Sequence, residues 1–281
     1  MFDIINSVLL VSVMVLLLGV GLSIPFSKVV AVATQYQLVL RGLAANFVIV
    51  PFVLAFALQY VPLSPDLVIG LLILAAVPLA PLAPPFVAIA QGDVAYSVGL
   101  MSVVAFLALP LTPLVLAITL PPSEAGLEID PLEIFRMLLT AQLIPLTIGL
   151  MINHFRPVWA EQMLRFVPRL GRVGVLCTLA LIAANQGEQI VEIGIVAYSV
   201  VLGTIVVCLL IGHVMMIDQG AALRRSLAVS TAIRNAALAL LIVNTNYPNS
   251  PAVTIVFMFG LISLLVAFSY GRLTRDSARP H

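Results

Sequence analysis

One short segment combines the side chains most capable of binding chemistry, and apolar residues surround it on both sides. Ser230-Thr231-Ala232-Ile233-Arg234-Asn235 joins a permanent positive charge to two hydroxyls and an amide, between the apolar runs Leu223 to Val229 and Ala236 to Val243. A charge inside a bilayer costs about 2.5–3.5 kcal/mol on insertion scales, so it persists where it faces a cavity or a partner. Arg234 is therefore either a ligand-binding group or a charge that neutralises a buried dipole and holds helices together.

The other reactive residues have simpler interpretations. His213 and Asp93 are the ionisable groups near the central spans that could carry a proton. We interpret His213 as an interfacial histidine at a helix end and Asp93 as the cap of a helix that starts at Val94. Cys177 and Cys208 stand in hydrophobic segments without a CxxC motif, so we expect packing residues and no metal site. No HExxH, GxSxG or paired-aspartate motif is present, which argues against an enzyme.

The elements that position these residues must be membrane helices. Of 281 residues, 62% are hydrophobic and 9% are charged, whereas about 25% are charged in globular domains. We therefore expect one integral membrane domain. The formal net charge is +1 and no basic run with interleaved aromatics occurs, so no nucleic-acid partner is expected. The first hydrophobic segment begins close to Met1 without a basic region or a cleavage pattern, which predicts a retained spanning helix.

Hydrophobic runs long enough to cross a bilayer recur along the chain and predict an all-α protein with nine transmembrane helices. A mixed segment from Arg156 to Arg165 reads as an interfacial amphipathic stretch. The nine predicted spans are Ile4 to Pro25, Leu38 to Tyr60, Leu67 to Ala90, Val94 to Leu120, Leu132 to Asn153, Val167 to Ala184, Val191 to Met215, Leu223 to Asn244 and Ala252 to Tyr270.

The lysines and arginines between the spans and near their ends fall almost entirely on one side of this arrangement, the pattern that marks the cytoplasmic side. Arg136 is the exception on the other side. We therefore expect a protein of the bacterial inner membrane with its amino terminus outside and its carboxyl terminus in the cytoplasm. The residues on the cytoplasmic side are Lys28, Arg41, Arg156, Arg165, Arg169, Arg172, Arg224, Arg225, Arg272, Arg275 and Arg279.

Two predicted spans are irregular. The third contains Pro78, Pro81, Pro84 and Pro85, and a regular helix cannot run through four interior prolines. The eighth is interrupted by the polar segment Ser230 to Asn235, whose side chains compete for backbone groups. Broken backbone at membrane depth is tolerated only inside protein or beside a water-filled cavity. Both breaks are therefore expected at the centre of the protein.

The third and eighth spans are five positions apart, so they cross the membrane in opposite directions. This relation predicts an inverted repeat with a binding site between two discontinuous helices near the bilayer midplane. Weak internal similarity agrees: Asp93-Val-Ala-Tyr-Ser-Val and Ser250-Pro-Ala-Val-Thr-Ile each open the span that follows a broken one.

Short motifs spread over nearly the whole chain resemble the bile acid/sodium symporter family. The resemblance implies a nine- or ten-helix transporter with two broken, crossing helices in a core (about 38–120 and 191–270). It also implies a smaller panel (about 4–25 and 132–184), against which the core moves to give alternating access. The motifs are Gly19-Val-Gly-Leu-Ser with Phe26, Asn46-Phe-Val-Ile-Val-Pro51, Pro78, Ala90-Gln-Gly-Asp-Val-Ala-Tyr-Ser-Val98, Leu111-Thr-Pro113, Pro145-Leu-Thr-Ile-Gly-Leu150 and Arg234-Asn235-Ala-Ala-Leu-Ala239.

The resemblance also implies positions for sodium ligands, and most of them carry unsuitable residues here. An acid and a glutamine of the second break correspond to Ser230 and Arg234. A hard cation needs several oxygen ligands, and Arg234 would repel it, so we expect no sodium at these positions and no cofactor. The other corresponding positions hold Ala83, Pro84, Met101, the retained Ser97, and Asn46 in place of a glutamine.

We therefore expect the Arg234 guanidinium to replace the ion as a built-in cation for a small organic anion, because its planar fork suits a carboxylate. Two alternatives remain: a sodium-coupled organic anion symporter with altered sites, and a membrane sensor that binds a ligand without transport. Expected partners are the anion and membrane lipid. The predicted substrate-binding residues are Arg234, Asn235, Ser230, Thr231, Asn46, Ser97, Pro84 and Pro85.

Overall fold

The structure is a computed structural model that describes residues 2–120, 130–248 and 250–276. Its elements are helices, and no strand occurs in these ranges, which confirms the expected all-α membrane protein. Eight helical segments of the described chain are long and apolar enough to cross a membrane. They are Asn6–Ser23, Tyr36–Leu58, Val94–Thr119, Pro131–Phe155, Pro157–Asn185, Gly194–Val214, Ala221–Asn246 and Pro251–Arg275.

The third predicted span is not among these eight, because each of its two helical pieces is short. Helix α5 (Pro65–Ala76) has 12 residues, and α6 (Ala83–Ile89) follows only after a non-helical stretch at 77–82. The eight long segments and this interrupted pair are consistent with nine spans. Length and hydropathy alone do not establish the pair as a ninth crossing. Arg279, used above in sorting the charges, lies outside the described residues.

The remaining elements include two π-helical segments, η1 and η2, each inside a long composite helix. They end just before Pro51 and Pro145, residues that cannot donate a main-chain hydrogen bond. The bounds are α1 (Phe2–Ser23), α2 (Phe26–Ala33), α3 (Tyr36–Leu43), η1 (Ala44–Ile49), α4 (Val50–Leu58), α7 (Val94–Thr119), α8 (Pro131–Leu138), η2 (Leu139–Leu143), α9 (Ile144–Phe155), α10 (Pro157–Leu164), α11 (Val167–Asn185), α12 (Gly187–Glu192), α13 (Gly194–Val214), α14 (Ala221–Ala232), α15 (Ala236–Asn246) and α16 (Pro251–Asp276).

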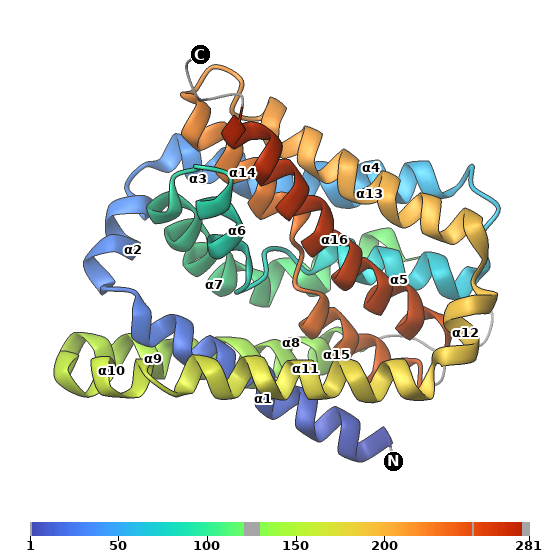
Figure 1. Cartoon of the computed structure of the whole chain (residues 1–281), viewed down its shortest axis with the longest axis horizontal. Helices are drawn as coiled ribbons and strands as arrows, with labels where there is room; N and C mark the ends of the chain where they lie inside the picture. The colour runs from blue at the N-terminus through green and yellow to red at the C-terminus, as the bar shows by residue number, and fades with distance from the viewer. Residues whose placement is uncertain (1, 121–129, 249, 277–281) are drawn as a thin grey trace.

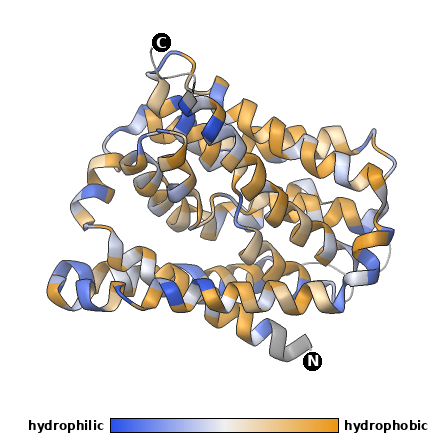
Figure 2. Cartoon of the chain, in the orientation of Figure 1, coloured by the Kyte–Doolittle hydropathy of each residue, from blue (hydrophilic) through white to orange (hydrophobic). Residues whose placement is uncertain are grey.

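The helices form two layers (Figure 1). In one layer α1 packs along α9 and α11, and in the other α13 packs on α14 and α16 on α5. Hydrophobic residues dominate most helices, and hydrophilic residues gather at helix ends and turns (Figure 2). Gly21 and Gly149 let α1 and α9 approach closely, because a Cβ at either position would overlap main-chain atoms of the other helix.

Candidate functional site

The two predicted breaks are present. Pro78 and Pro81 lie in the non-helical stretch between α5 and α6. Pro84 and Pro85 stand in the first turn of α6, where a missing N–H costs nothing because that group would have no intrahelical partner. The second break separates α14 from α15 at 233–235.

The two breaks touch through their main chains. The N–H of Ala80 in the first break donates to the carbonyl of Ile233 in the second at 3.0 Å. The contact brings together segments that lie far apart in the sequence, as the inverted-repeat interpretation requires. A side chain at one break can therefore reach main-chain carbonyls beside the other break.

Arg234 is the group that does so. Its side chain is only 1% exposed, and its Nε donates to the Leu74 carbonyl at 2.9 Å. Its Nη2 donates to the Ala75 carbonyl and, at 3.1 Å, to the Asn46 carbonyl. Nη1 reaches Oδ1 of Asn46 at 3.5 Å, the limit of a hydrogen bond. We call these four oxygen atoms, from Leu74, Ala75 and Asn46, the carbonyl cradle.

The cradle exists because local sequence removes the usual partners of its carbonyls. The last carbonyls of a helix lack their usual i+4 donors, and α5 ends at Ala76 because Pro78 follows. The Leu74 carbonyl keeps one main-chain donor, the Val77 N–H at 3.2 Å. The Asn46 carbonyl lies five residues before Pro51, so the i+5 donor that a π-helix would supply is missing. Thr112 of α7 completes the set by donating to the Ala76 carbonyl at 3.0 Å.

The guanidinium is thus a cation bound at the negative end of the α5 dipole. Four of the five N–H donors of an arginine have main-chain or amide acceptors here. Of the two interpretations of Arg234, the link between helices is therefore visible in the hydrogen bonds. A carboxylate would have to displace part of the cradle to receive the bidentate contact expected from the sequence.

The predicted hydroxyl and amide residues form a buried network next to the cradle. Ser97 and Ser230 share a hydrogen bond of 2.8 Å. The Asn46 amide donates to the Gly42 carbonyl at 2.9 Å and to the Thr231 hydroxyl at 3.4 Å. These four predicted residues are fully buried, and none of them borders the cavity described next. Their hydroxyls and amide hold α3, α7 and α14 together.

A small cavity of about 60 Å³ lies where both breaks meet the other layer. Its walls come from Val13 of α1, Val175 of α11, Phe257 of α16, and the break segments 80–82 and 233–237. This space holds a few water molecules, whereas organic ligands occupy about 300–1,000 Å³. The conformation described here is therefore closed around the cavity.

Asn235 is the predicted residue best placed to bind a ligand in this cavity. It caps α15 by accepting from the Leu238 N–H at 3.2 Å through Oδ1. Its Nδ2 makes no hydrogen bond with any described residue, although Asn235 is only 2% exposed. Ala236 and Ala237, in the first turn of α15, border the same space. The Asn235 Nδ2 donor and the positive end of the α15 dipole favour an anion there, although the Ala236 N–H is already bonded to the Arg234 carbonyl at 2.8 Å.

Pro84 and Pro85 do not line this cavity. Pro84 is buried and Pro85 is exposed, and the first break contributes Ala80, Pro81 and Leu82 instead. The predicted site thus divides into Arg234 and Asn235 at the cavity, four residues in the network, and two prolines that shape the start of α6. The first break lies where the sequence predicts it, but Ala80, Pro81 and Leu82 border the cavity and not the predicted Pro84 and Pro85.

Three residues at the cradle and the cavity were not predicted from the sequence. Thr112 belongs to the motif Leu111-Thr112-Pro113 quoted above, and that signal could have identified it. Gly260 permits α16 to lie close to the start of α15, because a Cβ there would come within 3.1 Å of the Ala236 Cβ. Ser263 borders the cavity from α16. Neither residue stands out in an apolar helix by sequence alone.

Most of the simpler interpretations agree with the structure. Asp93 caps α7 by accepting from the Tyr96 N–H at 2.9 Å. His213 is half-buried in the last turn of α13. Cys208 is buried, as expected of a packing residue, whereas the prediction of a packing role is wrong for Cys177, which is exposed.

Comparison with known proteins identifies the family of this chain. The sequence profile described as the sodium bile acid symporter family matches residues 9–193, more than half of the chain. The chain belongs to this family. The family groups transporters and not enzymes. The matched range includes the first break and ends before the second, so Arg234 lies outside it.

A relative from Bacillus subtilis (strain 168) bears the name uncharacterized sodium-dependent transporter YocS. It is 22% identical over 203 residues, which are 72% of this chain and 62% of the relative. The chain thus spans less than two thirds of the length of this curated relative.

Proposed function

We propose that the protein is a secondary transporter that carries a small organic anion, a carboxylate, by alternating access, with Arg234 in place of a coupling sodium ion. The observation that carries the proposal is the guanidinium in the carbonyl cradle. In transporters with discontinuous helices, half-helix C-terminal ends and unwound carbonyls coordinate the cation. Here a covalently attached cation occupies such oxygens.

The residues present do not suit sodium at these positions. Among the positions that correspond to sodium ligands, Ala83, Pro84 and Met101 offer no side-chain oxygen, and the Arg234 guanidinium already hydrogen-bonds to Asn46. No carboxylate lies in the network to offset a second positive charge, because its members are serines, a threonine and an asparagine. The fixed charge of Arg234 then favours an anion in the neighbouring cavity without an ion from solution.

For the substrate, we place the carboxylate at Asn235 and the first turn of α15, where donors face the cavity. Most of the other cavity-lining side chains are apolar, including Val13, Val175 and Phe257. This lining suits the hydrocarbon part of an organic acid. Ser230, Thr231, Asn46 and Ser97 then support the two breaks from behind, and Pro84 and Pro85 set the direction of α6.

The division into two moving units is also part of the proposal. The cavity lies between α1 and α11, within the suggested panel (4–25 and 132–184), and both breaks, within the suggested core (38–120 and 191–270). A shift of one unit against the other would enlarge the cavity and expose it to one side of the membrane. We place the protein in the bacterial inner membrane with its amino terminus outside.

Uptake into liposomes tests the function. Purified protein is reconstituted, and uptake of a panel of radiolabelled organic acids is compared under a sodium gradient and under potassium replacement. We expect uptake of at least one carboxylate at the same rate in both salts, and a loss of uptake in Asn235→Ala. Strictly sodium-driven uptake would overturn the built-in cation, and so would full activity of Arg234→Ala.

The name of the Bacillus relative favours one alternative, a sodium-coupled symporter with altered sites. The same uptake comparison separates it from our proposal, because only the alternative requires a sodium gradient. A non-transporting sensor would instead bind a carboxylate, seen as thermal stabilisation, and give no flux in either salt.

A further inference from the structure

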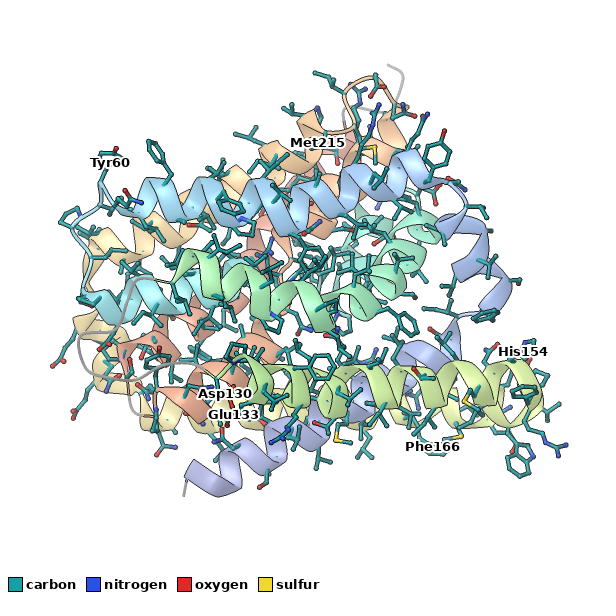
Figure 3. The ribbon with its side chains drawn as sticks, turned by 180° about the vertical axis from the view of Figure 1, so that it is seen from behind. Tyr60, Asp130, Glu133, His154, Phe166 and Met215 are labelled. Atoms are coloured by element: carbon teal, nitrogen blue, oxygen red, sulfur yellow. The ribbon has the colours of Figure 1, made fainter. Side chains whose placement is uncertain are left out.

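We propose that a second, outer binding site for the transported anion lies between α1, α8 and α15, with Arg136 as its recognition residue. The inference rests on the proposed function, because the ligand is the same anion on its way to the central cavity. A hollow of about 320 Å³ lies there, within the usual range for small-molecule sites. Figure 3 labels Glu133 near the start of α8, one of the residues around the hollow. The polar residues lining the hollow are Asn6, Ser7, Glu133, Arg136, Thr140 and Thr245.

The polar groups of this hollow are available to a ligand. Arg136 and Glu133 lie one turn apart on α8, yet they form no ion pair in the described chain, where the salt bridge is Arg41–Asp218. Within the described residues, the side chains of Arg136, Glu133, Ser7 and Thr245 make no hydrogen bond to protein. These four side chains are exposed and line the same hollow, so their polar groups are accessible to a ligand there.

This set of groups indicates the class of ligand. The Arg136 guanidinium suits a carboxylate through two parallel hydrogen bonds. Glu133 accepts hydrogen bonds only, so it favours a ligand that also carries a donor, such as a hydroxyl or an ammonium group. Ser7 and Thr245 can bond either part. The site therefore fits a small hydroxy- or amino-substituted carboxylate better than a plain fatty acid.

Arg136 is also the one basic residue on its side of the membrane by the alternation of the predicted spans. Asp66, Glu188 and Glu192 lie on that side, and their negative charges repel an anion. Within the hollow the charges of Arg136 and Glu133 balance, so Arg136 offers an anion a local positive contact on a face that otherwise repels it. Attraction elsewhere on this face would not lead to the central cavity.

The hollow and the central cavity share two helices. On α1, Leu10 borders the hollow and Val13 borders the cavity, a separation of about 4.5 Å along the helix axis. On α15, Leu241 and Leu240 border them respectively. The Asn244 amide donates to Asn6 Oδ1 and joins the same two helices beside the hollow. One layer of apolar side chains therefore separates the two spaces, and a movement of α1 against α15 would connect them.

The test uses glycerate, the simplest carboxylate with adjacent hydroxyls, as the probe. Thermal unfolding of the purified full chain in detergent is followed against glycerate concentration. The Asn235→Ala background removes the central anion contact, and we expect glycerate to stabilise this variant still. Adding Arg136→Gln should raise the glycerate concentration needed for the same stabilisation roughly ten-fold, because one charged hydrogen-bonding group is lost. The control is Arg169→Gln, the same change on an exposed arginine of α11 near the other end of α1. It should leave the required glycerate concentration unchanged.

Two outcomes overturn the outer site. One is the absence of glycerate stabilisation in Asn235→Ala, and the other is equal stabilisation with and without Arg136. Uptake kinetics separate this result from the proposed function: for the outer site we expect a higher KM in Arg136→Gln with kcat nearly unchanged. Uptake by Arg136→Gln with an unchanged KM would contradict the outer site and leave the proposed transport function standing. Glycerate binding that depends on Arg136, without uptake of any organic acid, would contradict the proposed transport function.

Discussion

At Arg234 two costly features compensate each other. A guanidinium without partners and the buried main-chain carbonyls of Ala75 and Asn46 without donors would each be unfavourable in an apolar interior. Together they form charge-assisted hydrogen bonds between α5, η1 and the break after α14. The residue therefore has a structural role in addition to its electrostatic role toward an anion.

Replacing Arg234 tests this coupling. Arg234→Gln should lower the free energy of unfolding by about 1–3 kcal/mol for each buried carbonyl that it leaves unpaired. Arg234→Lys should lose less, since it keeps the charge but not the planar fork. Denaturation in detergent measures both. The matched control is Arg172→Gln on exposed α11, expected within about 0.5 kcal/mol of the parent; a similar loss in the control would contradict the role of the cradle.

At the scale of elements, prolines and glycines determine where helices stop and how closely they pack. Pro78 ends α5 and Pro51 leaves the Asn46 carbonyl free, so two prolines in different spans create one acceptor set. Glycines act between helices. Gly21 and Gly149 face each other's main chain, which fixes α1 against α9 and so places one wall of the cavity.

Gly21→Leu tests this contact. The added side chain would collide with main-chain atoms of Leu146 and Leu150, so we expect destabilisation of about 1–3 kcal/mol and reduced carboxylate uptake. Gly203→Leu is the matched control, because nothing lies within 4 Å of its Cβ position on the exposed face of α13. Equal thermal midpoints for the two variants would contradict the close approach.

For the whole molecule, a salt bridge joins parts of the described chain that lie far apart in the sequence. Arg41 of α3 pairs with Asp218 in the turn between α13 and α14, with Nη2 to Oδ2 at 2.8 Å. The same guanidinium donates to the Met215 carbonyl at 3.3 Å. These contacts hold the start of the second long helix against a segment near the carboxyl-terminal third of the chain.

This pair makes a pH-dependent contribution to stability. The hydrogen bonds from Arg41 hold the pKa of the Asp218 carboxyl well below its usual range. A lowered folded-state pKa means that the contribution is complete above the unfolded value, about 3.9, and disappears as the pH falls toward the folded value. The midpoint difference between the parent and Asp218→Asn should be constant from pH 8 to pH 5 and shrink below about pH 4. A difference that shrinks already between pH 8 and pH 5 would contradict the assignment.

Composition and pattern were enough to predict an all-helical membrane protein, the two breaks, and the location of Arg234 and Asn235 in the second break, whereas the family was predicted from the resemblance of short motifs. These features depend on local properties: run length, proline positions and a charge in an apolar segment. The acceptors of Arg234 could not be predicted, because Leu74, Ala75 and Asn46 are more than 150 residues away in the sequence. Only the folded chain decided that Arg234 closes a carbonyl cradle while Asn235 faces the cavity, since hydrogen bonds form between groups that packing brings together.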